Sequence, residues 1–284
     1  MISLLLASAL VFSPEDAKLS YNTANMLVAE CTPRDAGTPR GKIAAYRILD
    51  AASAAGADVK MDTFRAETPK GERTFTNLVA EFCGDKNAAW VVLLSHYDTK
   101  SGIDCPGAND GASTSGLRVG VVTALTSWKK PRGNVMMIWT DGEECMEMYS
   151  ECDGLWGAKH AADKLAADGR KVKAVICMDM IGDRDLEITI PSNGSRALAK
   201  IACHAAKRIG DEKLVRLLPE HVTDDNVPFG KKGYKTINLI DFSYGSAPGL
   251  NDYWHTPKDT MDKISEASLL KSGRLVAEML NILL

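Results

Sequence analysis

An unbroken apolar run at residues 89–94 restricts the fold of this chain more than any other feature. A strand built from such a run has no polar face to turn toward water, so it must be covered on both sides, as in the centre of a parallel sheet. Further strands are expected at residues 135–139, 172–178 and 236–240, and helical stretches alternate with them. This alternation predicts an α/β fold, a three-layer α/β/α sandwich around a mixed, largely parallel sheet.

The helices of this sandwich are expected where apolar residues recur with helical spacing. Pro39 lies near an N1 position and Gly56 is a natural C-cap, which supports both ends of one helix. Alternating residues predict two early strands, at 59–65 and 74–82, which would extend the sheet in an antiparallel sense. The expected helices span residues 14–30, 39–55, 111–128, 154–167, 196–209 and 264–283.

Composition argues against several classes of partner. The 284 residues, 45% hydrophobic and 25% charged, are those of an ordinary globular protein of one large domain or two small ones. A net charge of −3 gives no reason to expect nucleic acid, and no apolar stretch is long enough to span a bilayer. The seven cysteines form no Cys-x-x-Cys pair, which argues against structural zinc. Free thiols are favoured, with a disulfide between Cys145 and Cys152 as the alternative.

Residues 1–12 are apolar and allow two interpretations. Ala-Ser-Ala at 7–9 resembles a signal-peptidase site, so the stretch would be the remnant of a signal peptide and the protein extracytoplasmic, either periplasmic or secreted. No Lys or Arg precedes Lys18, however, and a plain N-terminal helix is the alternative. If the stretch is a targeting remnant, the folded core should begin near Ser13.

Two adjacent acids, Glu143 and Glu144, follow the strand expected at 135–139. Neighbouring carboxylates repel each other, and burying them is costly unless a cation lies nearby. Adjacent side chains also point in different directions, so one carboxylate can bind a metal while the other moves protons. The alternative is a solvated acidic turn.

Polar side chains that can bind a metal recur where the predicted strands end. In open α/β sheets ligands bind at the carboxyl edge, where strand ends that are distant in sequence converge. Imidazoles and carboxylates without a thiolate suit catalytic zinc better than structural zinc. Asp98 follows the first of these histidines by two residues and is placed to hold its imidazole, with a simple turn residue as the alternative. The candidates are His96, Asp110, Glu143, Glu144, Asp179 and His255.

These residues lie in five motifs, and on these motifs the sequence resembles the zinc aminopeptidases of metallopeptidase family 28, which also includes glutaminyl cyclases. The motifs fall in the family's order and cover roughly residues 20–284, so the resemblance implies a single zinc-peptidase-like catalytic domain over residues 13–284. The motifs are Ser95-His96-Tyr97-Asp98, Gly107-Ala108-Asn109-Asp110, Asp141-Gly142-Glu143-Glu144, Met178-Asp179-Met180-Ile181-Gly182 and His255-Thr256-Pro257-Lys258-Asp259-Thr260.

The resemblance also implies roles for the candidate residues. Glu143 would be the general base and acid, and one or two zinc ions would bind at the other positions, with Asp110 bridging if two bind. The substrate would be the N-terminus of a peptide or protein. The implied metal positions are His96, Asp110, Glu144, Asp179 and His255.

Three features make the cyclase branch of the family the favoured one. Residues 145–162 match an insert that cyclases carry after the glutamate pair, Asp224-Asp225 resembles their paired acids, and Trp254 directly precedes His255. A cyclase would convert an N-terminal Gln to pyroglutamate and release ammonia. The resemblance then implies that Asp224 hydrogen-bonds the reacting amide nitrogen. Trp254, Tyr149 and Phe242 would wall the pocket.

The aminopeptidase branch, which hydrolyses the first peptide bond, stays open. Asn226 and Asn238 stand where cyclases tend to carry His, and Tyr149 stands where the animal enzymes carry Trp. The ending Pro257-Lys258-Asp259-Thr260 is also at home among aminopeptidases. A non-catalytic binding domain of the same fold is a more distant alternative. Such relatives typically lose a metal ligand or the base, whereas this sequence keeps all five metal positions and Glu143. The oligomeric state is open.

Overall fold

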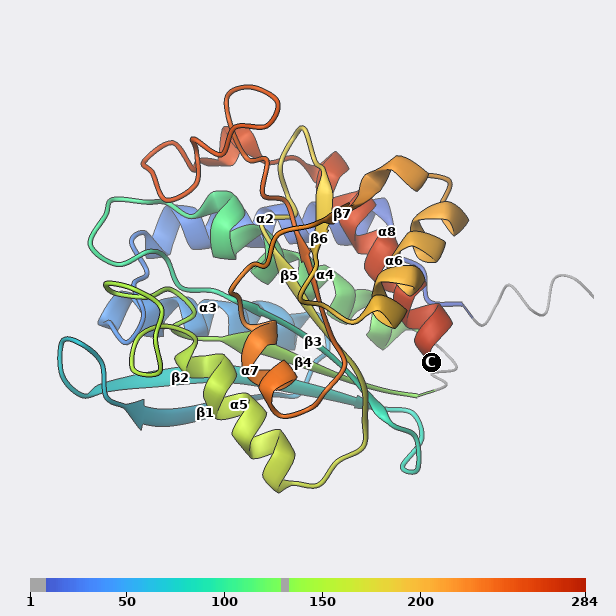
Figure 1. Cartoon of the computed structure of the whole chain (residues 1–284), viewed down its shortest axis with the longest axis horizontal. Helices are drawn as coiled ribbons and strands as arrows, with labels where there is room; N and C mark the ends of the chain where they lie inside the picture. The colour runs from blue at the N-terminus through green and yellow to red at the C-terminus, as the bar shows by residue number, and fades with distance from the viewer. Residues whose placement is uncertain (1–8, 129–132) are drawn as a thin grey trace, which may run out of the picture.

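An eight-stranded sheet forms the centre of the computed structural model, which describes residues 9–128 and 133–284 (Figure 1). The strand order is β1-β2-β4-β3-β5-β8-β6-β7. β4, β3, β5 and β8 run parallel, β2 pairs antiparallel with both β1 and β4, and β6 is antiparallel to β8. The strands are β1 (Val59–Ala66), β2 (Arg73–Cys83), β3 (Trp90–His96), β4 (Asn134–Thr140), β5 (Val172–Asp179), β6 (Ile188–Pro191), β7 (Val215–Leu218) and β8 (Thr236–Ile240).

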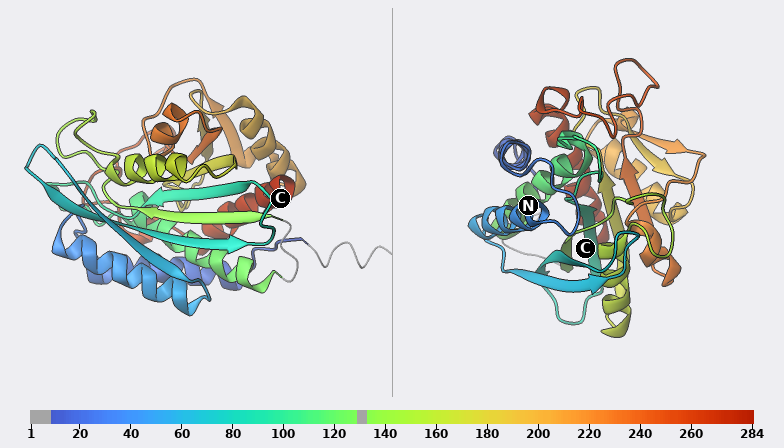
Figure 2. Two further views of the ribbon diagram at one scale, coloured as in Figure 1. Left: turned by 90° about the horizontal axis from the view of Figure 1, so that it is seen from below. Right: turned by 90° about the vertical axis from the view of Figure 1, so that its left-hand side faces the viewer.

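Helices cover both faces of this sheet, which confirms the predicted three-layer α/β/α sandwich (Figure 2). Five helices share the larger hydrophobic core on one face, and two share the smaller core on the other. The first group is α2 (Pro14–Cys31), α3 (Pro39–Ala54), α4 (Thr114–Ser127), α6 (Arg196–Arg208) and α8 (Glu266–Leu283). The second group is α5 (Trp156–Ala167) and α7 (Asn226–Lys231).

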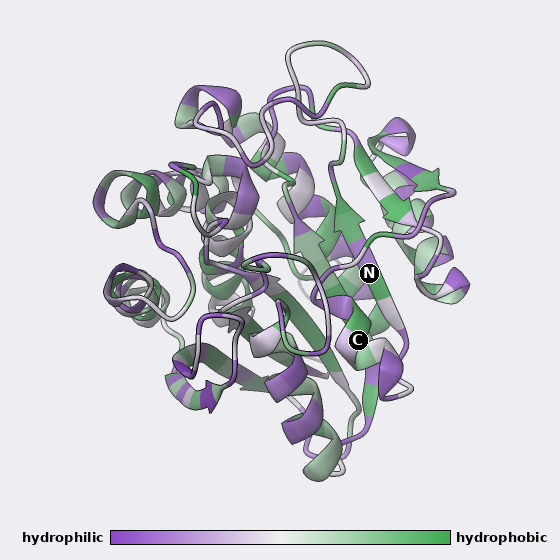
Figure 3. Cartoon of the chain, turned by 60° about the vertical axis from the view of Figure 1, so that its left-hand side comes forward, coloured by the Kyte–Doolittle hydropathy of each residue, from purple (hydrophilic) through white to green (hydrophobic). Residues whose placement is uncertain are grey.

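The central strand β3 shows why an unbroken apolar run was needed there. Val91 and Leu93 belong to the larger core, whereas Val92 and Leu94 belong to the smaller one. Successive side chains of a strand point to opposite faces, so each layer of helices receives every second residue. Figure 3 shows the resulting pattern, with hydrophobic strands inside and more hydrophilic surfaces on the helices around them.

The short elements β6, β7 and α7 were not predicted, and the start of α4 was predicted too early. β6, β7 and α7 contain only four, four and six residues, too few to carry a clear periodicity. The helix expected from residue 111 begins at Thr114, because Asp110 and Gly111 have non-helical dihedrals in the short segment Ala108–Ser113 that precedes it. That break turns the backbone at Asp110, one of the predicted metal positions.

Residues before Ser13 belong to the folded core, although a targeting remnant would leave the core to begin near Ser13. Leu10 and Phe12 are buried, and the backbone of Leu10 exchanges two hydrogen bonds with the side chain of Asn281 on α8. The ring of Phe12 fills space left by two glycines, because a Cβ at Gly120 or Gly273 would lie 3.1 or 2.2 Å from it. Residues 1–8, which hold most of the predicted targeting stretch, lie outside the described residues.

We therefore expect Phe12→Ala to lower the free energy of unfolding by about 3–5 kcal/mol, the usual cost of removing a buried aromatic ring. Val11→Ala is the control, because Val11 is 67% exposed and such substitutions change stability by about 0.5 kcal/mol or less. Urea unfolding of the two variants measures the difference. Equal stabilities would contradict the packing of this segment.

Two further sequence expectations concern cysteines and membranes. All seven cysteines lie within the described residues and are free, so Cys145 and Cys152 do not form a disulfide. Within residues 9–128 and 133–284, no helix combines the length and apolar character that crossing a bilayer requires.

Candidate active site

The five predicted metal positions meet at one edge of the sheet. His96 and Asp179 are the last residues of the parallel strands β3 and β5, and Glu144 follows the end of β4. Asp110 comes from the broken segment before α4, and His255 from the loop that precedes α8. The carboxyl ends of parallel strands share an edge, so residues far apart in sequence become neighbours there.

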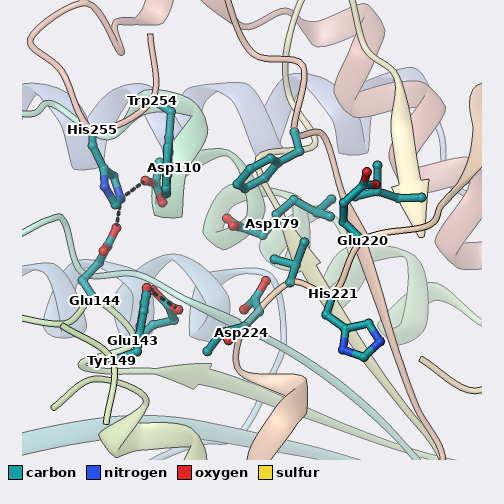
Figure 4. Close-up of a pocket in the computed structure, with 15 residues that line it drawn as sticks. Asp110, Glu143, Glu144, Tyr149, Asp179, Glu220, His221, Asp224, Trp254 and His255 are labelled. Atoms are coloured by element: carbon teal, nitrogen blue, oxygen red, sulfur yellow. Dashed lines mark hydrogen bonds and ion pairs between the residues drawn. The ribbon is translucent and has the colours of Figure 1, made fainter. Parts of the chain in front are cut away.

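Asp110 lies between two groups of candidate ligands. Its Oδ1 is 3.1 Å from Nε2 of His96, and that nitrogen is 3.3 Å from Oδ1 of Asp179. Its Oδ2 is 3.3 Å from Nε2 of His255, which lies 2.7 Å from Oε1 of Glu144 (Figure 4). Each group could hold a metal ion, and each contains Asp110. The arrangement can accept one ion or two, with one carboxylate shared.

The charges of this centre fit a bound cation. Asp110, Glu143, Glu144 and Asp179 are four buried carboxylates within one small volume. Oε2 of Glu144 is buried without a hydrogen-bond partner, and the Lys100 ammonium lies 3.6 Å from it. A buried carboxylate oxygen left in this state is costly unless a cation meets it. Imidazole nitrogens and carboxylate oxygens are ligands that zinc accepts.

Two structural groups hold Asp110 in place. The buried guanidinium of Arg34 donates to the backbone oxygens of Gly107 and Asp110, at 2.6 and 3.2 Å. The carboxylate of Asp259 accepts hydrogen bonds from the backbone N–H groups of Asn109 and Asp110, at 2.7 and 3.1 Å. Asp259 belongs to the last predicted motif, and this contact gives it a positioning role that the sequence alone did not reveal.

Asp98 has a broader role than the one predicted for it. Its carboxylate lies 3.6 Å from Nδ1 of His96, but that nitrogen is closer, at 3.1 Å, to the backbone oxygen of Asp98. The carboxylate itself accepts hydrogen bonds from the backbone N–H groups of Gly142, Glu143 and Glu144, at 3.0, 3.2 and 3.2 Å. Asp98 therefore positions both the imidazole and the turn that carries the two glutamates.

Gly142 makes this turn possible. Its φ is +76°, and a Cβ there would lie 2.8 Å from the Phe75 ring. A larger residue would be strained in its dihedrals and would clash with that ring. The turn sends Glu144 toward His255 and Glu143 toward Tyr149, as Figure 4 shows.

Glu143 is buried outside both groups of candidate ligands. The hydroxyl of Tyr149 donates to its carboxylate, at 2.9 Å from Oε1 and 3.1 Å from Oε2. Burial, followed by the neighbouring charge of Glu144, raises the pKa of Glu143 well above its ordinary value. A carboxylate in this position can accept a proton from a molecule in the pocket and return it.

Asp224 is buried beside the same pocket and is held by donors from two strands. Nδ2 of Asn238 on β8 donates to Oδ2 at 2.7 Å, and the Cys177 thiol on β5 donates to Oδ1 at 3.3 Å. Burial is the main cause that raises the pKa of Asp224. Asn238 thus has a direct contact with the candidate site.

A cavity of about 360 Å³ brings these groups together. The three predicted wall residues, Tyr149, Phe242 and Trp254, all line it. Trp254 packs against the His255 imidazole, with ring centroids 4.0 Å apart, and against Phe242 at 5.3 Å. The opposite wall is formed by the end of β7 and the segment that follows it, which the sequence did not single out because β7 itself was not predicted. Its lining residues are Leu218, Glu220, His221, Val222 and Thr223.

Comparisons with known proteins find similarity to peptidase family M28 and to glutaminyl cyclases. The profile of peptidase family M28 matches residues 77–280. The sequence is 33% identical to that of a glutaminyl cyclase from an Acidobacteriales bacterium. The crystal structure of that protein aligns with a TM-score of 0.87, and the alignment covers 94% of each chain. The glutaminyl-peptide cyclotransferase of Drosophila melanogaster is 24% identical over 266 residues, which cover 83% of this chain and 73% of that protein.

A zinc-dependent exopeptidase shares the fold as well. The structure of that protein from Parabacteroides distasonis aligns with a TM-score of 0.84 at 21% identity, covering 96% of this chain and 99% of that one. At this identity the likeness shows the fold alone.

Proposed function

The chain belongs to peptidase family M28, and from that premise we propose that it is a zinc-dependent glutaminyl-peptide cyclotransferase. Its substrates would be peptides or proteins with an N-terminal Gln, and its products pyroglutamyl peptides and ammonia. The similarity to a glutaminyl cyclase over 94% of the chain supports this branch.

One observation carries the proposal: the three features that favoured the cyclase branch face the same cavity. Tyr149 from the 145–162 insert, Asp224 from the acid pair and Trp254 before His255 all line it. A cyclase must fold the substrate's amine back onto its own side chain, which requires a pocket shaped around one residue. The insert and Trp254 supply walls, and Asp224 supplies an acceptor between them.

The candidate metal residues, Glu143 and Asp224 each have a place in this reaction. The two groups that share Asp110 would hold zinc, which supplies Lewis acidity to the side-chain carbonyl oxygen of the substrate. Glu143 takes a proton from the α-amine, whose nitrogen then bonds to the side-chain carbonyl carbon. The bond from that carbon to the amide nitrogen breaks, and Glu143 returns the proton so that ammonia leaves. Asp224 accepts a hydrogen bond from that amide nitrogen and orients it.

An aminopeptidase is the second candidate, and one observation favours it. The group formed by His96, Asp110 and Asp179 is complete beside the group that contains His255. Two metal ions sharing one carboxylate are the arrangement used by many aminopeptidases to activate water. In that reaction Glu143 would take the proton from the attacking water.

The two candidates predict different effects of Asp224→Ala. In a cyclase this substitution removes the acceptor for the leaving nitrogen, and we expect kcat for Gln-peptides to fall about 10²-fold or more. The wild-type cyclase should hydrolyse Leu- or Ala-anilides very little. Ammonia release and anilide release are measured on the same preparation. Melting temperature and zinc content of the variant show that the fold and the metal centre are retained. Rapid anilide hydrolysis that Asp224→Ala leaves intact would establish the aminopeptidase instead.

A further inference from the structure

A second hollow, of about 610 Å³, lies between α6 and the ends of β6 and β7. Its floor is apolar and includes Ile190, Leu217 and Leu218. Leu217 is 61% exposed, although leucine on a strand is usually buried. We call this hollow the β7 groove. None of the roles assigned above uses it.

The β7 groove adjoins the active-site cavity at Leu218. Leu218 lines both hollows, and the segment from Glu220 to Thr223 lines the cavity from there to Asp224. In Figure 4, Glu220 and His221 lie on the far side of the pocket from Glu144 and His255. The cavity thus extends from the candidate metal residues toward β7, and the β7 groove lies next to it at Leu218.

The position of the groove beside the cavity indicates an occupant, given the proposed function. When an N-terminal Gln sits beside Glu143, the rest of the polypeptide must leave the pocket past its outer wall. We propose that the residues following the N-terminal Gln run along residues 218–223, and that an apolar side chain among them binds in the β7 groove. The groove is then a specificity subsite for the body of the substrate.

The chemistry of the groove further defines this segment of the substrate. Arg196 and Lys200 are exposed on the α6 side, so an acidic residue next to the apolar one is favoured. β7 is the last strand of the sheet and pairs with β6, which leaves an edge where an extended peptide can add hydrogen bonds. Residues 218–224 span at most about 25 Å in extended form, so the apolar residue lies within about six positions of the Gln.

The test uses heptapeptides that begin with Gln and otherwise contain alanine, with one leucine moved along the chain. We expect KM to fall about tenfold when the leucine reaches the groove, compared with the dipeptide Gln-Ala, while kcat changes little. A remote contact made equally in the ground state and the transition state has this signature. Replacing the alanine after that leucine with aspartate should lower KM further, and added salt should remove this second gain.

Leu217→Asp tests the assignment to the groove. Within this variant, the ratio of KM for Gln-Ala to KM for the best heptapeptide should fall from about ten toward one. Ile43→Asp is the matched control, because Ile43 is also an exposed aliphatic residue but lies on α3, which packs against β1 and β2 at the other end of the sheet. The ratio should stay near ten in the control.

A binding measurement separates this inference from the proposed function. Dye-labelled pyroglutamyl heptapeptides with and without the leucine should differ about tenfold in Kd by fluorescence anisotropy, and Leu217→Asp should remove the difference. Cyclisation of Gln-Ala without any effect of the leucine on KM or Kd would reject the subsite and leave the function standing. Absence of cyclisation with a leucine-dependent Kd would reject the function alone. A change from dimer to monomer in Leu217→Asp, with the KM ratio unchanged, would make the groove a contact between two copies and overturn the proposal.

Discussion

Glu143→Gln should retain its zinc and lose about 10²–10⁴-fold in kcat, the usual contribution of a positioned acid–base group. The substitution preserves the size of the side chain but removes its ability to take a proton. Glu143 lies outside both groups of candidate ligands, so metal binding should continue. The Tyr149 hydroxyl can still donate to the remaining carbonyl oxygen, so the local packing should be kept.

Glu147→Gln is the matched control for this experiment. It makes the same chemical change at an exposed glutamate of the same loop. Steady-state kinetics and zinc content are measured for both variants. Full activity of Glu143→Gln would show that another group moves the proton.

His255→Ala should raise the Kd for zinc by about 10–100-fold or more. Loss of residues that only support a metal ligand already costs this much, and His255 is in direct contact with Asp110 and Glu144. Chelation of the wild type should abolish activity, and added zinc should restore it. Zinc should also raise the melting temperature of the wild type, because it binds the folded state.

His160→Ala serves as the control for His255→Ala. His160 is a partly exposed histidine that contacts Asp62, away from the candidate metal residues. A zinc titration followed by calorimetry gives the affinity and the number of ions for each variant. Wild-type affinity in His255→Ala would remove this residue from the ligand set.

Much of this site could be anticipated because its residues sit where buried strands end. The apolar run before His96 and the acid pair after β4 mark positions that the strand order then brings together. Neither observation required knowledge of the strand order itself. Asp110 was harder to place by spacing alone, because its position depends on the backbone break at Gly111 and on the contacts of Arg34.

Other features depend on contacts that no local pattern encodes. β6 and β7 are too short for a periodic signal, so the wall that follows β7 and the β7 groove could not be foreseen. Asp98 looked like a support for one imidazole, yet its carboxylate organises three backbone groups. The burial of Phe12 could not be foreseen, because glycines on α4 and α8, distant in sequence, create the space that it fills.

The products formed from a peptide with N-terminal Gln test the central claim most directly. Mass spectrometry of the peptide and an ammonia assay are run on the same reaction, with chelated enzyme as the control for spontaneous cyclisation. We predict one ammonia per peptide converted, and a peptide that keeps every residue and begins with pyroglutamate. Free glutamine together with a peptide shortened by one residue would contradict the cyclotransferase and show that the chain is an aminopeptidase.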